Sequence, residues 1–259
     1  ATAASCAVVD RQDLSSAHWL FPETDQAQVL ADQGLLTRIG CQFHWHNSRD
    51  YRDFQDFLET LTSKRRKAIR RERRQVHDAG IAMNVVPGDA VADEDWRLFH
   101  ELYRRTFEEH GNLPVLTPRF FARVGADLGD RVLMIQARRD DQLVAAALLL
   151  RSGDTLFGRY WGCFEEIPGL HFETCYYQGI AYCIEQGIDR FEPGAQGEHK
   201  IPRGFLPTPT RSCHWIADHR FRHAIADFLE RERAMVDDYM TRAQAHSPYR
   251  AHRGSSEPS

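Results

Sequence analysis

One segment in the last third of the chain, residues 191–205, reads FEPGAQGEHKIPRGF and concentrates side chains that can exchange protons. Its ionisable residues are Glu192, Glu198, His199, Lys200 and Arg203. Carboxylates and imidazoles accept protons from substrates, and glycines let the backbone approach a bound molecule closely. The alternative is a surface loop in which the glycines and prolines only turn the chain, and the sequence leaves both open.

Positive charge gathers in a second segment, residues 64–74, which reads KRRKAIRRERR. It holds eight basic residues and one acid, Glu72, in a chain whose formal net charge is −4. Such a segment suits phosphate groups, as in tRNA, coenzyme A or a lipid pyrophosphate, and makes binding salt-dependent. The alternative is a solvated helix face that acids elsewhere in the chain balance. Because Arg65 falls within the apolar stripe of the helix, we expect it to point towards a cleft or a buried partner.

A third candidate group combines GRYWGC (158–163) with HFETCYYQG (171–179). Its aromatic and charged members of interest are Arg159, Tyr160, Trp161, Glu173 and Tyr177. Aromatic side chains in such segments commonly belong to the core. Glu173 also has a purely structural interpretation, since a carboxylate near a helix N-terminus balances the helix dipole.

Residue types that bind metals are scattered along the chain. His44 and His46 share one strand face, but no third ligand lies nearby in the sequence. The six cysteines form no CxxC pair, which favours reduced thiols in a cytoplasmic protein. We therefore predict that the protein has no metal site.

The composition, 42% hydrophobic and 27% charged over 259 residues, is that of an ordinary soluble globular protein. No apolar run approaches the roughly 18 residues of a membrane helix, and the N-terminus lacks the basic start and long apolar core of a signal peptide. Since the chain also lacks an initiator Met, we expect a fragment or a trimmed front.

The elements that must position these groups follow from hydrophobic periodicity. It predicts helices at 51–79, 93–109, 118–128, 170–186 and 220–245, and strands at 81–86, 131–138, 143–150, 155–162, 188–192 and 211–217. Short turns at Asp140-Asp141 and Gly153 make the strands from 131 to 162 an antiparallel meander. This order predicts an α+β fold with a mixed sheet and helices on both faces.

Several segments carry a family resemblance: CQFHWHN, SKRRKAIRRERR, RYWGC and FEPGAQGEHKIPRGF. Together they resemble the bacterial FemAB-like predicted N-acyltransferases, a peptidoglycan biosynthesis or recognition family of the GNAT superfamily. The resemblance extends from about Ser15 to Ser247. It implies a GNAT-like fold, usually built of two lobes. This chain then holds the end of a first lobe (1–48), an acyltransferase lobe (49–248) and a disordered tail (249–259).

The resemblance implies transfer of an acyl or aminoacyl group to an amine, in peptidoglycan precursor or related metabolism. The donor would be aminoacyl-tRNA or acyl-CoA, with no other cofactor. GNAT enzymes hold coenzyme A in a glycine-rich loop, but the corresponding segment CFEEIPGLHFET has one glycine, Gly169. Fem-type relatives use aminoacyl-tRNA, for which a basic helix is useful.

The resemblance also assigns roles to the candidate residues. Lys200 would bind phosphate or stabilise developing negative charge, and Glu192 would accept a proton or orient the amine. The expected substrate-binding residues are Arg65, Arg70, Arg159, Tyr160, Trp161, Glu173, Tyr177, Gln196, Glu198, His199 and Arg203. A rival interpretation is a non-catalytic module that binds peptidoglycan fragments or nucleic acid in the same cleft. The oligomeric state stays open.

Overall fold

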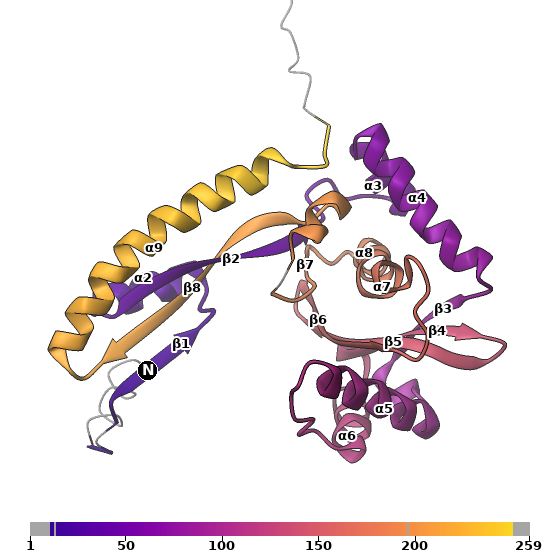
Figure 1. Ribbon diagram of the computed structural model, residues 1–259, viewed down its shortest axis with the longest axis horizontal. Coiled ribbons are helices and arrows are strands. Elements are labelled where there is room, and N and C mark those ends of the chain that lie inside the picture. Colours follow the sequence, from indigo (N-terminus) through magenta and orange to yellow (C-terminus); the bar gives the residue numbers. More distant parts are fainter. Residues whose placement is uncertain (1–10, 13, 196, 251–259) are drawn as a thin grey trace, which may run out of the picture. The chain divides into compact units, whose positions relative to one another are not determined.

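The computed structural model describes residues 11–12, 14–195 and 197–250. The chain forms two compact units, and their strands and helices are drawn in Figure 1. Unit 1 comprises residues 1–42 and 206–246, and unit 2 comprises residues 43–205 and 247–259.

Unit 2 is built on a mixed sheet, which confirms the predicted fold class. Its strands are β3 (Ala82–Pro87), β4 (Val132–Arg139), β5 (Gln142–Ser152), β6 (Thr155–Cys163), β7 (Arg190–Glu192) and the last four residues of β2 (Leu36–His46). They are ordered β2-β7-β6-β5-β4-β3. The pair β6–β7 is parallel, and the pairs β2–β7, β3–β4, β4–β5 and β5–β6 are antiparallel.

The meander β4–β5–β6 has the turns that the sequence predicts. Asp140 and Asp141 both take positive φ, at 48° and 62°, which matches a two-residue hairpin turn. Gly153 takes φ 58° in the next turn. The pairing of β5 with β6 shifts between Leu148 and Leu149, which marks a β-bulge in the middle of the sheet.

Helices cover both faces of this sheet. On one face, α5 (Asp93–Glu109) and α6 (Pro118–Leu128) pack their aromatic side chains against β4 and β5. On the other, Val76 of α4 (Ser63–Asp78) and Leu170 of α7 (Leu170–Phe172) pack against Ala137 and Ala145. Figure 1 shows α5 and α6 below the sheet of unit 2 and α4, α7 and α8 (Gln178–Glu185) above it.

The predicted single helix 51–79 is wrong, because the structure divides it into α3 (Phe54–Thr60) and α4. Leu61 between them is extended, with ψ 156°, and bridges Tyr249. Asp53 caps α3 by accepting a hydrogen bond from Asp56 N at 2.7 Å. The break therefore depends on pairing with the distant C-terminal segment, which local periodicity does not report.

Two residues of the predicted tail are structurally engaged. The Tyr249 hydroxyl donates a hydrogen bond to Gly204 O at 2.7 Å, and Arg250 N donates to Thr60 O at 2.9 Å. The rest of the predicted tail, residues 251–259, lies outside the described residues.

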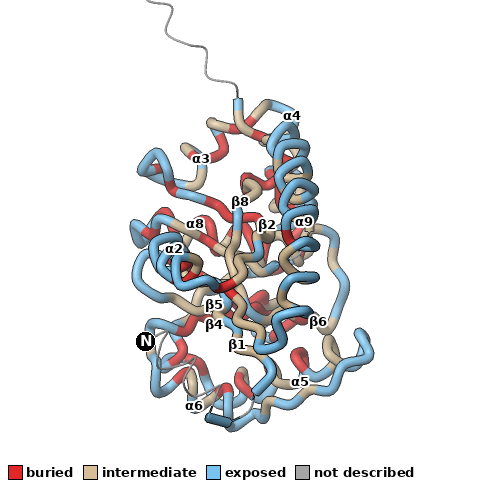
Figure 2. Tube along the Cα trace, turned by 90° about the vertical axis from the view of Figure 1, so that its left-hand side faces the viewer, coloured by how far each residue is buried: buried red, intermediate tan, exposed pale blue. Residues whose placement is uncertain are grey.

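Unit 1 combines β1 (Ser16–Leu20), β8 (Leu206–Ile216) and the first part of β2 with α2 (Thr24–Asp32) and α9 (His219–Ala245). Strands β1 and β8 pair antiparallel, and Ala27 and Leu30 of α2 pack with Cys213 and flanking tryptophans. The sequence analysis placed β8 and α9 with the acyltransferase lobe, whereas they pack here with the N-terminal segment. Figure 2 shows the largely exposed or half-buried surface of α9.

The length and polarity of the helices show whether any of them could span a membrane. Across the described residues, the helices are too short or too polar to span a bilayer.

Candidate active site

The site lies in unit 2, where the helix after β6 faces the loop after β7. The helix starts at Gly169, whose φ is 86°. A Cβ there would lie 2.8 Å from Glu72 O, so the helix start packs tightly against α4. The helix then widens into a π-helical turn, η3 (Glu173–Tyr177), before α8 begins. Such turns re-aim side chains and are frequent at functional sites.

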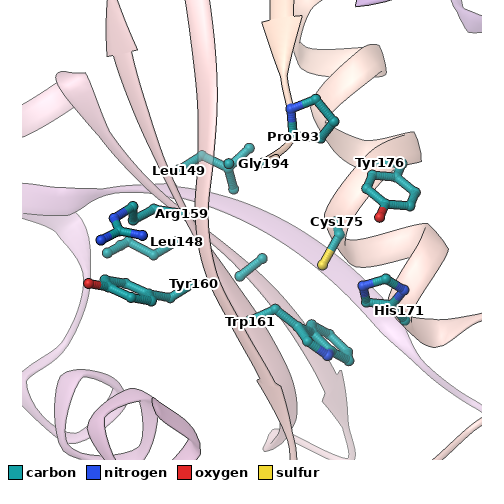
Figure 3. Close-up of a pocket in the computed structure, with 12 residues that line it drawn as sticks. Leu148, Leu149, Arg159, Tyr160, Trp161, His171, Cys175, Tyr176, Pro193 and Gly194 are labelled. Carbon is teal, nitrogen blue, oxygen red and sulfur yellow. The ribbon is translucent and has the colours of Figure 1, made fainter. Parts of the chain in front are cut away.

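A cavity of about 130 Å³ lies between this helix and the sheet. Figure 3 shows its lining side chains. Trp161, His171, Cys175 and Tyr176 lie on the helix side of the strands, and Pro193 and Gly194 border it from the loop after β7. The sequence singled out Trp161, and the structure brings it to this cavity.

Arg159 and Tyr160 also contribute to the lining, but their side chains lie across the strands from Trp161 (Figure 3). The bulge explains this, because Leu148 pairs with Tyr160 and Leu149 with Gly158, leaving Arg159 as the extra residue. The Tyr160 ring packs 5.0 Å from that of Tyr103, and the Arg159 guanidinium lies 4.4 Å from the Tyr160 ring centroid. Their role in substrate binding stays a prediction.

Lys200 is the most deeply buried charge of the loop, with 2% of the residue exposed. It belongs to a short 3₁₀ helix, η4 (Glu198–Arg203), and its Nζ donates a hydrogen bond to Gly194 O at 2.5 Å. Burial lowers the pKa of Lys200 from 10.5 to about 8. Lys200 does not itself line the cavity, but its ammonium bonds the backbone of Gly194, which does.

The neighbouring groups of the cavity are neutral. Burial, with the neighbouring His199 imidazole and the Arg203 guanidinium, lowers the pKa of His171 to about 4. Burial raises the pKa of the Cys175 thiol and of the Tyr176 hydroxyl. The Tyr176 hydroxyl and His199 Nε2 are hydrogen-bonded at 2.8 Å. The groups on the helix side of the cavity are therefore uncharged, and the charged residue in its lining is Arg159.

Glu198 and His199 differ in how they relate to the cavity. His199 reaches its wall through the Tyr176 hydroxyl, and burial lowers its pKa. Glu198 is exposed. Gln196 lies outside the described residues.

Arg203 and Tyr177 converge on Glu72 of the basic helix. Arg203 Nη2 donates to Glu72 Oε1 at 2.7 Å, and the Tyr177 hydroxyl donates to the other carboxylate oxygen. Arg203 also donates to His199 O at 2.6 Å and stacks over the Phe172 ring at 3.3 Å from its centroid. These contacts fix η4 to α4 and leave binding by Arg203 and Tyr177 as predictions.

Glu173 is buried and also paired with the basic helix. It accepts a hydrogen bond from Arg73 Nε at 3.0 Å and another from Gln178 Nε2 at 2.7 Å. Arg70 is exposed and donates to Gln55 Oε1 at 2.9 Å. Arg65, expected to face a cleft, is half-buried.

Glu192, the predicted proton acceptor, ends β7. Its Oε1 lies 3.2 Å from Arg190 Nε and 3.8 Å from His44 Nδ1. Burial, with the neighbouring His46 imidazole and the Arg190 guanidinium, lowers the pKa of His44 to about 4, so that the His44 imidazole is neutral at pH 7. The carboxylate is thus held by neighbours, and its catalytic role stays a prediction.

The residues that sequence reasoning did not select as ligands are His171, Cys175 and Tyr176. His171 and Cys175 are four residues apart, a spacing that places side chains on one helix face. The sequence also did not predict that Glu72 would accept hydrogen bonds from Arg203 and Tyr177, although Glu72 stood out as the one acid within the basic segment. Within the described parts of the chain, no group of three His, Cys, Asp or Glu side chains is placed to hold a metal ion.

The chain belongs to the FemAB-like family, whose model, described as peptidoglycan biosynthesis/recognition, matches residues 2–251. The family resemblance seen in the sequence is thereby confirmed. No curated protein sequence matches the chain significantly.

Solved structures share the GNAT-like fold. The C-terminal domain (DUF2156) of a protein assigned as a lysylphosphatidylglycerol synthetase from Agrobacterium fabrum is 12% identical, with a TM-score of 0.60 over 86% of this chain and 75% of that one. FemX is 12% identical, with a TM-score of 0.59 over 87% and 78%. L-PGS from Bacillus licheniformis is 10% identical, with a TM-score of 0.59 over 86% and 75%. At these identities the likeness shows the fold.

Proposed function

We propose that this protein transfers an aminoacyl or acyl group to an amine of a peptidoglycan precursor or a related metabolite. The observation that carries the proposal is the buried Lys200 ammonium, which bonds the cavity-lining Gly194. Membership of the FemAB-like family and the fold shared with FemX and lysylphosphatidylglycerol synthetase support it.

Attack of an amine on an acyl carbon places negative charge on the carbonyl oxygen. A fixed cation in a water-poor site stabilises that charge strongly. Lys200, with a pKa of about 8, is mostly protonated at pH 7 and can also give a proton to the leaving group. The neutral His171 imidazole accepts a hydrogen bond from the incoming amine. Glu192 remains our proposed group for receiving the amine proton.

The cavity chemistry favours direct attack over a covalent enzyme intermediate. The thiolate is the nucleophilic form of cysteine, and burial raises the pKa of Cys175 well above neutral. A protonated thiol in this cavity is a poor nucleophile. The acyl group therefore passes from donor to amine in one step at the carbonyl.

The basic helix suits the phosphates of either donor, and one contact at the helix after β6 favours aminoacyl-tRNA over acyl-CoA. The exposed cations of α4 provide a surface for phosphates. At the start of the helix after β6, the Glu72 carbonyl oxygen packs against Gly169. A pyrophosphate at that helix start would meet this oxygen, which carries partial negative charge.

Turnover separates this proposal from the rival recognition module. The protein is incubated with radiolabelled aminoacyl-tRNAs, or with acyl-CoA thioesters, and with peptidoglycan precursor peptides as acceptors. We expect label to move from tRNA to an acceptor amine with release of free tRNA. Saturable binding of precursors without transfer from either donor class would reject the enzyme and favour the recognition module.

A further inference from the structure

A second hollow of unit 2 lies beside the basic helix, and different residues line it from those that line the cavity. It is a groove of about 650 Å³ bordered by α3, α4, β3 and η3. Its apolar surface comes from Phe54, Val76 and Met83, and its cations come from Arg70, Arg73 and Arg74. A hollow of this volume is in the range that holds drug-sized ligands.

The charges in the groove do not cancel. Arg73 is matched by Glu173, whose carboxylate lies 3.0 Å from Arg73 Nε, and it stacks at 4.5 Å from the Phe54 ring centroid. Arg70 bonds the neutral amide of Gln55. Glu173 is the acid among the described lining residues, so Arg70 and Arg74 leave about two positive charges facing the groove.

Two positive charges beside an apolar surface suit a ligand with the opposite combination. Guanidinium groups recognise phosphate oxygens in bidentate fashion and also stack on planar rings. A simple phosphate would leave the apolar surface wet, and a purely apolar ligand would leave the arginines without anions. A nucleoside phosphate satisfies both parts.

We propose that this groove binds a nucleoside phosphate, with its phosphates on Arg70 and Arg74 and its base on the surface of Phe54, Val76 and Met83. The site shares η3 with the cavity, because Glu173 lines the groove while Cys175 and Tyr176 line the cavity. The inference goes beyond transfer at Lys200, and binding at the groove is measured without turnover.

The test is isothermal titration of the full chain with uridine diphosphate, adenosine diphosphate, inorganic pyrophosphate and a short single-stranded RNA. Its variant is Arg70→Gln with Arg74→Gln. The matched control is Lys64→Gln with Lys67→Gln, which removes the same charge from exposed positions of the same helix outside the groove. Circular dichroism confirms that both variants fold.

We expect a diphosphate nucleotide to bind, with Kd raised about tenfold or more in the groove variant and less than about twofold in the control. Pyrophosphate should bind at least about tenfold more weakly than the nucleotides, because it cannot cover the apolar surface. Binding of both the RNA and the nucleotides through the groove identifies an RNA end as the source of the nucleoside phosphate. Binding of the nucleotides alone identifies a free nucleotide or a nucleotide-linked carrier.

Three results would overturn the inference. Nucleotides and RNA that fail to bind at millimolar concentration leave the groove without this ligand. Equal losses in the two double variants point to diffuse attraction along α4. Equal affinities for pyrophosphate and nucleotides remove the role of the apolar surface. Label transfer at Lys200 is measured in its own assay with tRNA and thioester donors, so the two proposals fail separately.

Discussion

Glu72 of α4 and Arg203 of η4 form a largely buried ion pair, in which the side chains are 17% and 10% exposed and Arg203 Nη2 lies 2.7 Å from Glu72 Oε1. The pair joins the basic helix to the short helix that carries Lys200. Tyr177 donates a hydrogen bond to the same carboxylate, so three segments of unit 2 meet there. The acid within the basic segment therefore organises the candidate site, whichever anions the exposed cations bind.

Replacing Glu72 by Gln should destabilise unit 2. The Arg203 side chain, 10% exposed, would keep its charge without an anionic partner. Breaking a buried ion pair in this way costs about 3 kcal/mol. Urea unfolding measures the loss, and Glu59→Gln, at an exposed position, is the control. Equal midpoints for Glu72→Gln and the wild type would show that the pair contributes no net stability.

The pKa of Lys200 makes stability depend on pH. Below about pH 8 the ammonium is charged in both folded and unfolded chains, and burying it costs stability. Between about 8 and 10.5 the folded chain has lost this proton while the unfolded chain keeps it, so stability rises with pH.

We therefore compare wild type with Lys200→Met across this window. Wild type should gain about 3 kcal/mol relative to the variant from pH 7 to pH 10.5, since the pKa is lowered from 10.5 to about 8 and one pKa unit corresponds to about 1.4 kcal/mol. Chemical denaturation at each pH gives the difference, which cancels the titration of other groups. Parallel curves for the two proteins would mean that Lys200 titrates normally.

Gly158 controls the space between β6 and the loop after β7. A Cβ at this position would lie 3.1 Å from the Pro193 Cα, closer than the backbone normally allows. Gly158→Ala should displace Pro193 and Gly194, alter the cavity and cost about 1–3 kcal/mol. Thermal unfolding and transfer assays measure both effects. Unchanged stability and transfer would show that the loop yields freely.

Tyr249 holds η4 from the C-terminal side. Tyr249→Phe keeps the ring and removes the hydrogen bond to Gly204 O, at a cost of about 1 kcal/mol. Hydrogen exchange should rise in residues 198–205 more than in β4 or β5. An increase spread evenly over unit 2 would argue against a local clamp.

The sequence predicts correctly those elements whose signals lie within a few residues of each other, and it misses features that depend on distant parts of the chain. Helices α5 and α6 have the predicted bounds, because their periodicity, the Pro118 start and the glycine end are all local. The break at Leu61 depends on Tyr249, far along the chain. Strand β8 begins at Leu206, before the predicted residue 211, because Pro207 and Pro209 read locally as loop.

In the candidate site, too, the sequence indicates the residue types but not which side chains face the cavity. The sequence identified the loop around Lys200 and the RYWGC strand by residue type and resemblance. It selected Tyr177 as a ligand, whereas Tyr176 lines the cavity and Tyr177 bonds Glu72. The π-helical turn changes which side chains face the sheet, and the choice depends on tertiary packing that helical periodicity does not encode.

The most direct test of the account is the single-turnover rate of label transfer by wild type, Lys200→Met and Lys67→Met, with aminoacyl-tRNA and an acceptor amine. Lys67 is an exposed cation of α4 and serves as the control. We predict that Lys200→Met lowers the rate by about 10²–10³-fold with its melting temperature preserved, as expected for loss of a fixed group that stabilises an oxyanion. With aminoacyl-tRNA saturating for each protein, Lys67→Met should transfer at nearly the wild-type rate, because a cation of the α4 surface contributes to tRNA binding and not to the chemical step. Full transfer by a folded Lys200→Met would contradict the account.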